Sequence, residues 1–320
     1  MIENDVEMSL IDTHSHCPRL KDDSRKRFIK DLYGERGKCI SKIINIAVSY
    51  DENIDAEEPG ENGCSIFRGR LCDDEGNIYS KLNYFAHGIH PKEVHQVVFS
   101  GIHDMSDYEI ETLENEIFNK LKDICSDSNN KCVAIGETGF EFYYDEPYKY
   151  KDLQRRFYER HIELAHELDL PLIIHHRSSK DDTLGRENAN EEGIKLLKEN
   201  AGLLRNNPGV IHCYIGTYEE ARIFCEEMSF VLGIGAAFLD ERNDELREVI
   251  KRIPLEWIVL ETDTPYIKPK GLNTGYKQNT PLNLPYIASG IAKLKGVSIK
   301  EVARITTNNA YRVFDKLNEW

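Results

Sequence analysis

The stretch Leu10-Ile11-Asp12-Thr13-His14-Ser15-His16 is an apolar run that ends in two histidines two positions apart. In a β-strand, residues i and i+2 point to the same side, so both imidazoles leave one face and can converge on one metal ion. Far downstream, the apolar run Trp257-Ile258-Val259-Leu260 leads into Glu261 and Asp263. The two stretches together predict a metal site that is assembled from distant parts of the chain.

Apolar, β-branched runs recur along the whole sequence and are typical of buried strands. There are eight of them, at residues 9–14, 39–49, 84–90, 132–137, 170–176, 209–214, 229–236 and 257–262. Segments with helical 3-4 spacing of apolar residues lie between many of the runs, most clearly at 106–124, 149–169 and 243–253. Strands that alternate with helices imply right-handed βαβ units and a parallel sheet. Eight such strands favour an α/β fold of the closed (β/α)8 TIM-barrel type over an open doubly wound sheet, which is the alternative.

Length and segment composition favour one barrel domain that spans residues 1–320. The chain has 320 residues, and α/β barrels of this size commonly form single units. Residues 50–80 are acidic and contain glycine, which predicts a solvated loop between two strands. A second long loop, rich in lysine, proline, asparagine and glycine, is expected at 268–282 at the mouth of the barrel. The tail from Pro285 is expected to form helices that close the domain.

Charge and cysteine usage restrict the class of protein. Lys+Arg 41 against Asp+Glu 56 gives a net charge of −15, which argues against a broad basic face for duplex nucleic acid. A small pocket in which divalent metals supply the positive charge remains compatible with this balance. The eight cysteines are scattered and lack CxxC pairs, which is typical of reduced thiols. With no secretory signal and no apolar stretch of membrane-spanning length, we expect a cytoplasmic protein, with the nucleus as the alternative, and no membrane association.

Candidate metal ligands occur where the predicted strands end, which in parallel barrels is the end that carries the active site. They are His14 and His16 after the first strand, Glu137 after the fourth, His175 after the fifth, His212 after the sixth and Asp263 after the eighth. A lone histidine at a strand end is more often a structural residue, but six such groups on five strands favour a site. Four imidazoles and two carboxylates suit two divalent ions (Mg, Mn or Zn), with Glu137 as the bridge.

On these residues the chain resembles the TatD family of metal-dependent deoxyribonucleases, within the amidohydrolase-like barrels. The shared strings cover nearly the whole chain: DTHSH at 12–16, GIHP at 88–91, IGETGFEF at 135–142, PLIIHHR at 171–177, IHCY at 211–214, ETDTPY at 261–266, NTPLNLPYIA at 279–288 and TTNNAYRVF at 306–314. Each string alone is weak, but their joint order and spacing are specific. The resemblance implies a (β/α)8 barrel of the metal-dependent hydrolase type. It also implies phosphodiester hydrolysis, often 3′-to-5′ on single-stranded DNA.

The chain departs from the family pattern at three places. Glu141 stands where relatives usually carry Asp, Ser178-Ser179 stands where an Asp usually follows the Arg, and Tyr214 replaces a Phe. We expect none of these residues to contact a proposed ligand, so the departures bear on substrate fit rather than on metal binding.

For several other residues the sequence is compatible with more than one role. His90 either contacts substrate phosphate or orients a neighbouring ligand. Arg177 shares a strand face with His175 and is expected to hold a phosphate by a bidentate contact, with a structural ion pair as the alternative. Glu261 is expected to orient a metal ligand by a hydrogen bond rather than to bind the metal itself. We expect the remaining groups to be packing or surface residues: His87, His95, His103, His161, His166, His176, Cys213, Lys268, Lys270 and Lys277.

The leading hypothesis is an enzyme that hydrolyses nucleic-acid phosphodiesters, with DNA, single-stranded or at 3′ ends, as its partner and no obligate protein partner. Divalent metals lower the pKa of a bound water, and Asp263 is the best-placed general base, with Glu137 as the second catalytic carboxylate. Hydrolysis of a small ester, lactone, amide or aminoacyl bond is the alternative within enzymes, because one barrel serves both chemistries. A non-catalytic binding barrel is the alternative outside enzymes, and the intact ligand set argues against it.

Overall fold

The eight predicted strands form one parallel sheet whose spatial order is the order along the chain. The computed structural model describes residues 8–54, 82–99, 105–271 and 275–319. The strands are β1 (Leu10–Ser15), β2 (Ile40–Ala47), β3 (Asn83–His87), β4 (Cys132–Glu141), β5 (Leu172–Arg177), β6 (Gly209–His212), β7 (Val231–Ile234) and β8 (Ile258–Leu260). The predicted (β/α)8 barrel is therefore confirmed.

The ends of the sheet meet between β1 and the segment that follows β8. Ser15 and Thr264 form a parallel bridge there. The His16 amide donates to the Thr264 carbonyl at 2.6 Å, and the Asp263 amide donates to the His14 carbonyl at 2.9 Å. The closure of the barrel thus brings the first and the last predicted ligands together through backbone hydrogen bonds.

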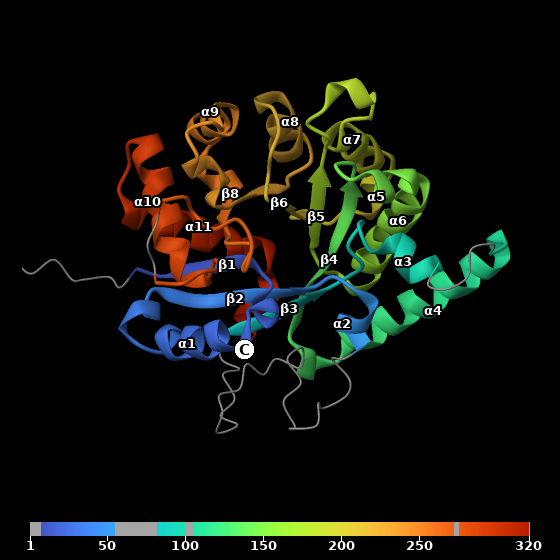
Figure 1. Ribbon diagram of the computed structural model, residues 1–320, viewed down its shortest axis with the longest axis horizontal. Coiled ribbons are helices and arrows are strands. Elements are labelled where there is room, and N and C mark those ends of the chain that lie inside the picture. The colour runs from blue at the N-terminus through green and yellow to red at the C-terminus, as the bar shows by residue number, and fades with distance from the viewer. Residues whose placement is uncertain (1–7, 55–81, 100–104, 272–274, 320) are drawn as a thin grey trace, which may run out of the picture.

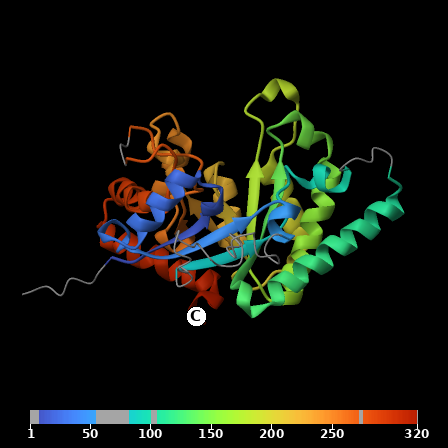
Figure 2. The same ribbon diagram turned by 60° about the horizontal axis from the view of Figure 1, so that its bottom comes forward.

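Helices lie on the outside of the strands (Figure 1), and α4 extends away from β1 and β8 in both views (Figures 1 and 2). Their bounds are α1 (Asp22–Leu32), α2 (Tyr50–Ile54), α3 (Val94–Phe99), α4 (Asp107–Ser126), α5 (Asp145–Lys149), α6 (Lys151–Leu168), α7 (Ala189–Glu199), α8 (Tyr218–Arg222), α9 (Asp244–Arg252), α10 (Leu284–Lys295) and α11 (Ile299–Val313). Local sequence explains several ends. Ser106 and Glu109 form a capping box at the start of α4, and Gly296 ends α10 with φ of 68°.

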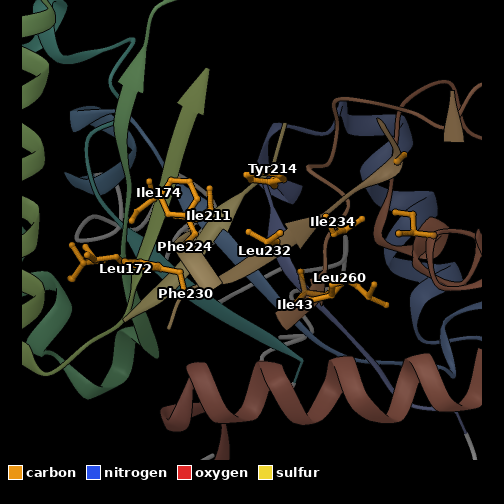
Figure 3. Close-up of a cluster of buried hydrophobic side chains, with 14 of the residues drawn as sticks. Ile43, Leu172, Ile174, Ile211, Tyr214, Phe224, Phe230, Leu232, Ile234 and Leu260 are labelled. Atoms are coloured by element: carbon orange, nitrogen blue, oxygen red, sulfur yellow. The ribbon is translucent and has the colours of Figure 1, made fainter. Parts of the chain in front are cut away.

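Two apolar clusters hold the barrel. One combines alternate residues of the strands, such as Ile44, Ile46 and Val259, with Phe314 and Leu317 from the chain end. The other lies between strands and helices, where Leu232 and Ile234 pack near Phe224 and Phe230 (Figure 3). Burial of large apolar side chains on both faces of the strands is what a parallel barrel requires.

The predicted segments differ from the structure mainly at strand ends. The fourth strand continues four residues beyond Glu137, whereas the eighth ends at Leu260, before the carboxylates. The predicted helices 106–124, 149–169 and 243–253 are confirmed as α4, α6 and α9, and the tail from Pro285 is helical. Most of the acidic insertion 50–80 lies outside the described residues. Among the described residues, no helix combines the length and apolar character needed to cross a membrane.

Candidate metal centre

The β1 histidines converge as the two-residue spacing predicts. The Nε2 atoms of His14 and His16 are 3.2 Å apart, and both side chains are buried. The Nδ1 atom of His16 lies 3.0 Å from the Ile46 carbonyl oxygen on β2, which leaves Nε2 free to face its neighbour. Two imidazole nitrogens that face each other at this distance are well placed to share a cation.

Glu137 lies between two groups of histidines, and its two oxygens face different groups. Oε2 is 3.4 Å from His14 Nε2 and 4.0 Å from His16 Nε2. Oε1 is 2.8 Å from His175 Nδ1 and 3.9 Å from His212 Nε2. This is the arrangement expected of a carboxylate that bridges two metal ions.

Asp263 completes the cluster from the segment after β8. Its Oδ1 atom is 3.4 Å from His16 Nε2 and 4.0 Å from His14 Nε2. The expectation that Asp263 ends the eighth strand is wrong, because the strand stops at Leu260 and Asp263 has a left-handed φ of 55°. The backbone bond to His14 holds this turn in place, so Asp263 still reaches the cluster.

Two buried carboxylates contact the candidate ligands or the residues next to them. Glu261 Oε1 accepts the Cys213 amide at 2.7 Å and lies 3.1 Å from His212 Nδ1, as expected of a residue that orients a ligand. Asp12, which the sequence analysis did not single out, accepts the Thr262 hydroxyl at 2.6 Å and the Thr262 amide at 2.9 Å. It therefore anchors the residue just before Asp263.

Glu141 is the main correction to the predicted site. Its Oε2 atom is 3.3 Å from His175 Nε2. The expectation that none of the three residues that differ from the family pattern contacts a proposed ligand is therefore wrong. The physical reason is the extension of β4, in which Gly139 pairs with His175 and Glu141 pairs with Arg177. A Cβ atom at Gly139 would lie 2.0 Å from the His175 carbonyl oxygen, so the close approach requires glycine. The period-two rule, applied beyond Glu137, would have identified Glu141.

The two predicted substrate contacts lie beside the cluster. His90 Nε2 is 3.4 Å from Glu137 Oε1, and its ring centroid is 4.4 Å from that of His175. His90 is thus close enough to join a ligand group with Glu137 and His175. Arg177 reaches only 3.9 Å from Glu141, and its guanidinium lies over the Tyr143 ring at 4.1 Å.

Most of the remaining predictions of packing and surface roles are confirmed. His176 faces away from His175 and packs against Gly193 of α7. His87 and His161 are buried, His95 stacks on Tyr150, and His166 is exposed, while His103 lies outside the described residues. Lys270 contacts Asp240 at 2.5 Å, Lys268 donates to the Tyr276 carbonyl, and Lys277 is exposed.

Cys213 is only partly a packing residue. Its sulfur, a His212 nitrogen and an Asp263 oxygen all lie within 4.8 Å of one another. Burial raises the pKa of the thiol well above its ordinary value. A strand-end position alone does not reveal this, because Cys213 has a left-handed φ of 45° that turns it out of the strand alternation.

The negative charges of the buried carboxylates raise the pKa values of two histidines in the cluster. Burial lowers the pKa of His175, but contacts with Glu137 and Glu141 outweigh burial and raise it to about 10. Burial also opposes the charge of His212, whose neighbours Glu261 and Glu137 raise its pKa to about 9. Burial opposes ionisation of Glu137 too, yet His90, His14 and His212 bring its pKa well below the ordinary value. The protons on His175 and His212 therefore carry the positive charge that a divalent cation would carry in their place.

The donor set fits divalent metal. The imidazole nitrogens and carboxylate oxygens come from β1, β4, β5, β6 and the segment after β8, and each lies within 4.0 Å of at least one other. His14 Nδ1 is buried without a hydrogen-bond partner, and burial together with the charge of His212 lowers the His14 pKa to about 4, which keeps this imidazole neutral. Neutral imidazole is the form that binds Zn, Mn and similar ions.

A cavity of about 340 Å³ opens over the cluster at the C-terminal end of the strands. Three cations line it, namely Arg19, Lys92 and Arg177, together with two tyrosines, Tyr144 and Tyr266. The acidic chain thus presents positive and aromatic groups at the one place where the candidate ligands gather.

Comparison with known proteins identifies the family. A model of the TatD-related DNases matches residues 11–315. The chain belongs to the TatD family. The uncharacterized metal-dependent hydrolase YcfH of Escherichia coli (strain K12) is 29% identical over 307 residues, 96% of this chain and 96% of YcfH. The protein named 3′-5′ ssDNA/RNA exonuclease TatD, from Rahnella sp. (strain Y9602), is 33% identical over 186 residues, 57% of this chain and 65% of that protein.

The solved structure of YJJV, a TatD homolog from Escherichia coli k12, has the same fold. It matches with a TM-score of 0.68 and 21% identity, over 96% of this chain and 98% of YJJV. This match shows the fold, and the family model together with YcfH identifies the chain as a metal-dependent hydrolase of the TatD family, as the resemblance implied.

Proposed function

We propose that this TatD-family hydrolase is a deoxyribonuclease that cleaves single-stranded DNA from the 3′ end, with two divalent ions (Mg, Mn or Zn). The observation that carries the proposal is the position of Glu137, whose Oε2 atom faces His14 and whose Oε1 atom faces His175, beneath a cavity lined by cations. A phosphodiester is an anion that such a site would bind and activate.

The ligands divide between two ions according to the atoms that they face. His14 and His16 would hold one ion together with Asp263, and His175 and His212 would hold the other, with Glu137 shared. Divalent ions in such a site lower the pKa of bound water and polarise a phosphoryl oxygen. Glu261 and Glu141 orient His212 and His175 and add negative charge behind them.

Asp263 is the proposed general base. Burial opposes its ionisation, but His16, His212 and His14 lower its pKa, so the carboxylate is ionised near neutral pH, which is the form that a general base requires. It also lines the cavity, where an attacking water would lie. Arg177, and His90 beside it, are the proposed contacts to substrate phosphate. Arg177 makes no close ion pair among the described residues, and its guanidinium retains donors for a bidentate contact.

The substrate proposal combines the cavity with the relatives. The relative from Rahnella is named for exonuclease activity on ssDNA and RNA. The cavity provides cations for a backbone and exposed aromatic rings for bases, which are the two elements of a single-strand site. Binding of a small ester or lactone requires neither element.

The test is hydrolysis of 5′- and 3′-labelled single-stranded oligonucleotides by purified protein, with Mg, Mn and Zn added separately. We expect products that shorten stepwise from the 3′ end, more slowly on a blunt duplex, and none from Glu137→Ala. Glu114→Gln is the matched control, since Glu114 is a buried carboxylate on α4 that pairs with Arg156. Turnover of small esters with no cleavage of any oligonucleotide would refute the proposal.

A further inference from the structure

Two exposed tyrosines stand on opposite sides of the ligand cluster. Tyr144 follows β4 and Tyr266 follows β8, and both line the cavity. They are 40% and 45% exposed, so part of each ring is accessible to a ligand in the cavity. Tyr144 lies near Lys92 and near Arg177 on β5, whereas Tyr266 lies near His16 and Arg19 after β1, so the two rings approach the cluster from different sides.

The backbone under Tyr144 is held firmly, and two cations lie near its ring. Arg186 donates to the Phe142 and Tyr143 carbonyls at 2.8 and 2.9 Å, and Glu141 Oε1 accepts the Tyr143 amide at 2.9 Å. The guanidinium of Arg177 is 5.2 Å from the centroid of the Tyr144 ring, and Lys92 Nζ is 5.1 Å from it. This side of the cavity combines a positioned aromatic face with groups that attract phosphate.

Tyr266 is held by a different set of contacts. Arg19 donates to the Tyr266 hydroxyl at 3.1 Å and is itself oriented by Glu52, whose Oε1 accepts from Arg19 Nε at 2.6 Å. The ring stands edge-on to His16, with centroids 5.8 Å apart and an angle of 67° between the planes. The Tyr266 ring thus lies directly beside a candidate metal ligand without being buried by it.

We propose that Tyr144 and Tyr266 form a two-sided clamp that stacks on the unpaired nucleobases next to the scissile phosphodiester. Arg177 and Lys92 would bind the adjacent backbone phosphate on the Tyr144 side. The proposal rests on the nuclease function proposed above and goes further by assigning the base-binding residues. Stacking on an aromatic face accepts every base, and a paired base inside a duplex has no free face to offer. The clamp therefore gives a preference for single strands without sequence selectivity.

The test compares tyrosine variants with substrates that lack one base. Tyr144→Leu and Tyr266→Leu are assayed on a single-stranded oligonucleotide and on versions with an abasic residue at the 3′-terminal or at the penultimate position. We expect kcat/KM on the intact strand to fall about 5- to 150-fold for each variant, the range that one stacked base provides. On one of the two abasic substrates, each Leu variant should have the same kcat/KM as the wild type. The reason is that removal of the base has already removed the contact that the ring makes.

Two controls separate stacking from damage to the fold. Tyr144→Phe keeps the ring and should lose much less kcat/KM than Tyr144→Leu, and Tyr108→Leu, on α4 with 78% exposure, should have no effect. Losses that persist equally on intact and abasic strands, or no loss in either Leu variant, would overturn the clamp while leaving the nuclease intact. Failure of the wild-type protein to cleave any oligonucleotide would overturn the proposed function and the clamp with it.

Discussion

Glu261→Gln should weaken metal binding although it removes no proposed ligand. The Glu261 side chain is fully buried, and its Oε1 atom lies 3.1 Å from His212 Nδ1. That contact turns Nε2 of His212 toward Glu137, at 3.9 Å. Glutamine preserves the shape and can still accept the Cys213 amide, but it lacks the negative charge that favours a strongly basic imidazole.

The magnitude follows from the role of a carboxylate behind a ligating histidine. Loss of such a partner typically lowers metal affinity 10- to 100-fold, which is about 1.4 to 2.7 kcal/mol. The surviving bond to Cys213 keeps the backbone in place, so we expect the change to appear in affinity and not in the fold.

The assay is calorimetric titration of metal-free protein with Zn and with Mn at pH 7.5, alongside thermal unfolding. Glu114→Gln, which removes a buried carboxylate on α4 far from the cluster, is the matched control and should bind metal like the wild type. An unchanged affinity in Glu261→Gln would show that Glu261 has no part in orienting His212. An equal loss in the control would attribute the effect to general destabilisation.

Further predictions concern metal number, catalysis, substrate binding and pH. Elemental analysis at saturating metal should give two ions per chain, and Glu137→Ala should lower both occupancies because the bridge is shared; one ion in the wild type would contradict this. Asp263→Asn should lower turnover about 100-fold or more while it loses only part of the bound metal. Near-normal hydrolysis by this variant would exclude Asp263 as the base. Arg177→Ala should raise KM for oligonucleotides and keep its metal content; an unchanged KM would contradict phosphate binding. Burial lowers the pKa of His161 from 6.5 to about 4, so the unfolded chain binds a proton that the folded chain does not, and stability falls as pH falls from 6.5 toward 4. The free energy of unfolding in urea should therefore fall between pH 7.5 and pH 5 by about 2 kcal/mol less in His161→Gln than in the wild type. An equal fall in both proteins would refute this.

The fold and the meeting of the candidate ligands could be predicted because they depend on regular features of strands and of parallel barrels. Strand alternation places His14 and His16 on one face, and the polarity of parallel barrels brings strand ends together at one rim. The first rule acts over a few residues and the second holds for every parallel barrel, so neither depends on the details of side-chain packing. They predicted the meeting of Glu137 with histidines from three other strands.

The misplacements have two other origins. Glu141 was missed because β4 runs four residues beyond Glu137, and the remaining differences arise where the backbone departs from regular alternation. Asp263 and Cys213 lie in left-handed turns, in which strand parity no longer says where a side chain points. Such turns depend on long-range bonds, such as that from Asp263 to His14, which no local pattern contains.

The stacking tyrosines show the same dependence on long-range structure. Exposed aromatic rings are a recognised feature of single-strand sites, yet the sequence holds 16 tyrosines and 12 phenylalanines with nothing local to separate them. Tyr144 and Tyr266 stand out only when Arg186 and Arg19 are seen to hold their segments beside the cavity.

The acidic balance of the chain is compatible with a nucleic-acid substrate once distance is considered. At physiological salt the Debye length is about 8 Å, so acidic groups across the surface are largely screened from the cavity. Arg19, Lys92 and Arg177 line the cavity together with four carboxylates, those of Glu93, Glu137, Glu141 and Asp263. Two bound divalent ions would offset these four negative charges, and the basic side chains would then dominate the field that a phosphodiester meets. A net charge of −15 therefore bears on binding along a broad duplex face, whereas a strand end that enters the cavity meets a locally positive field.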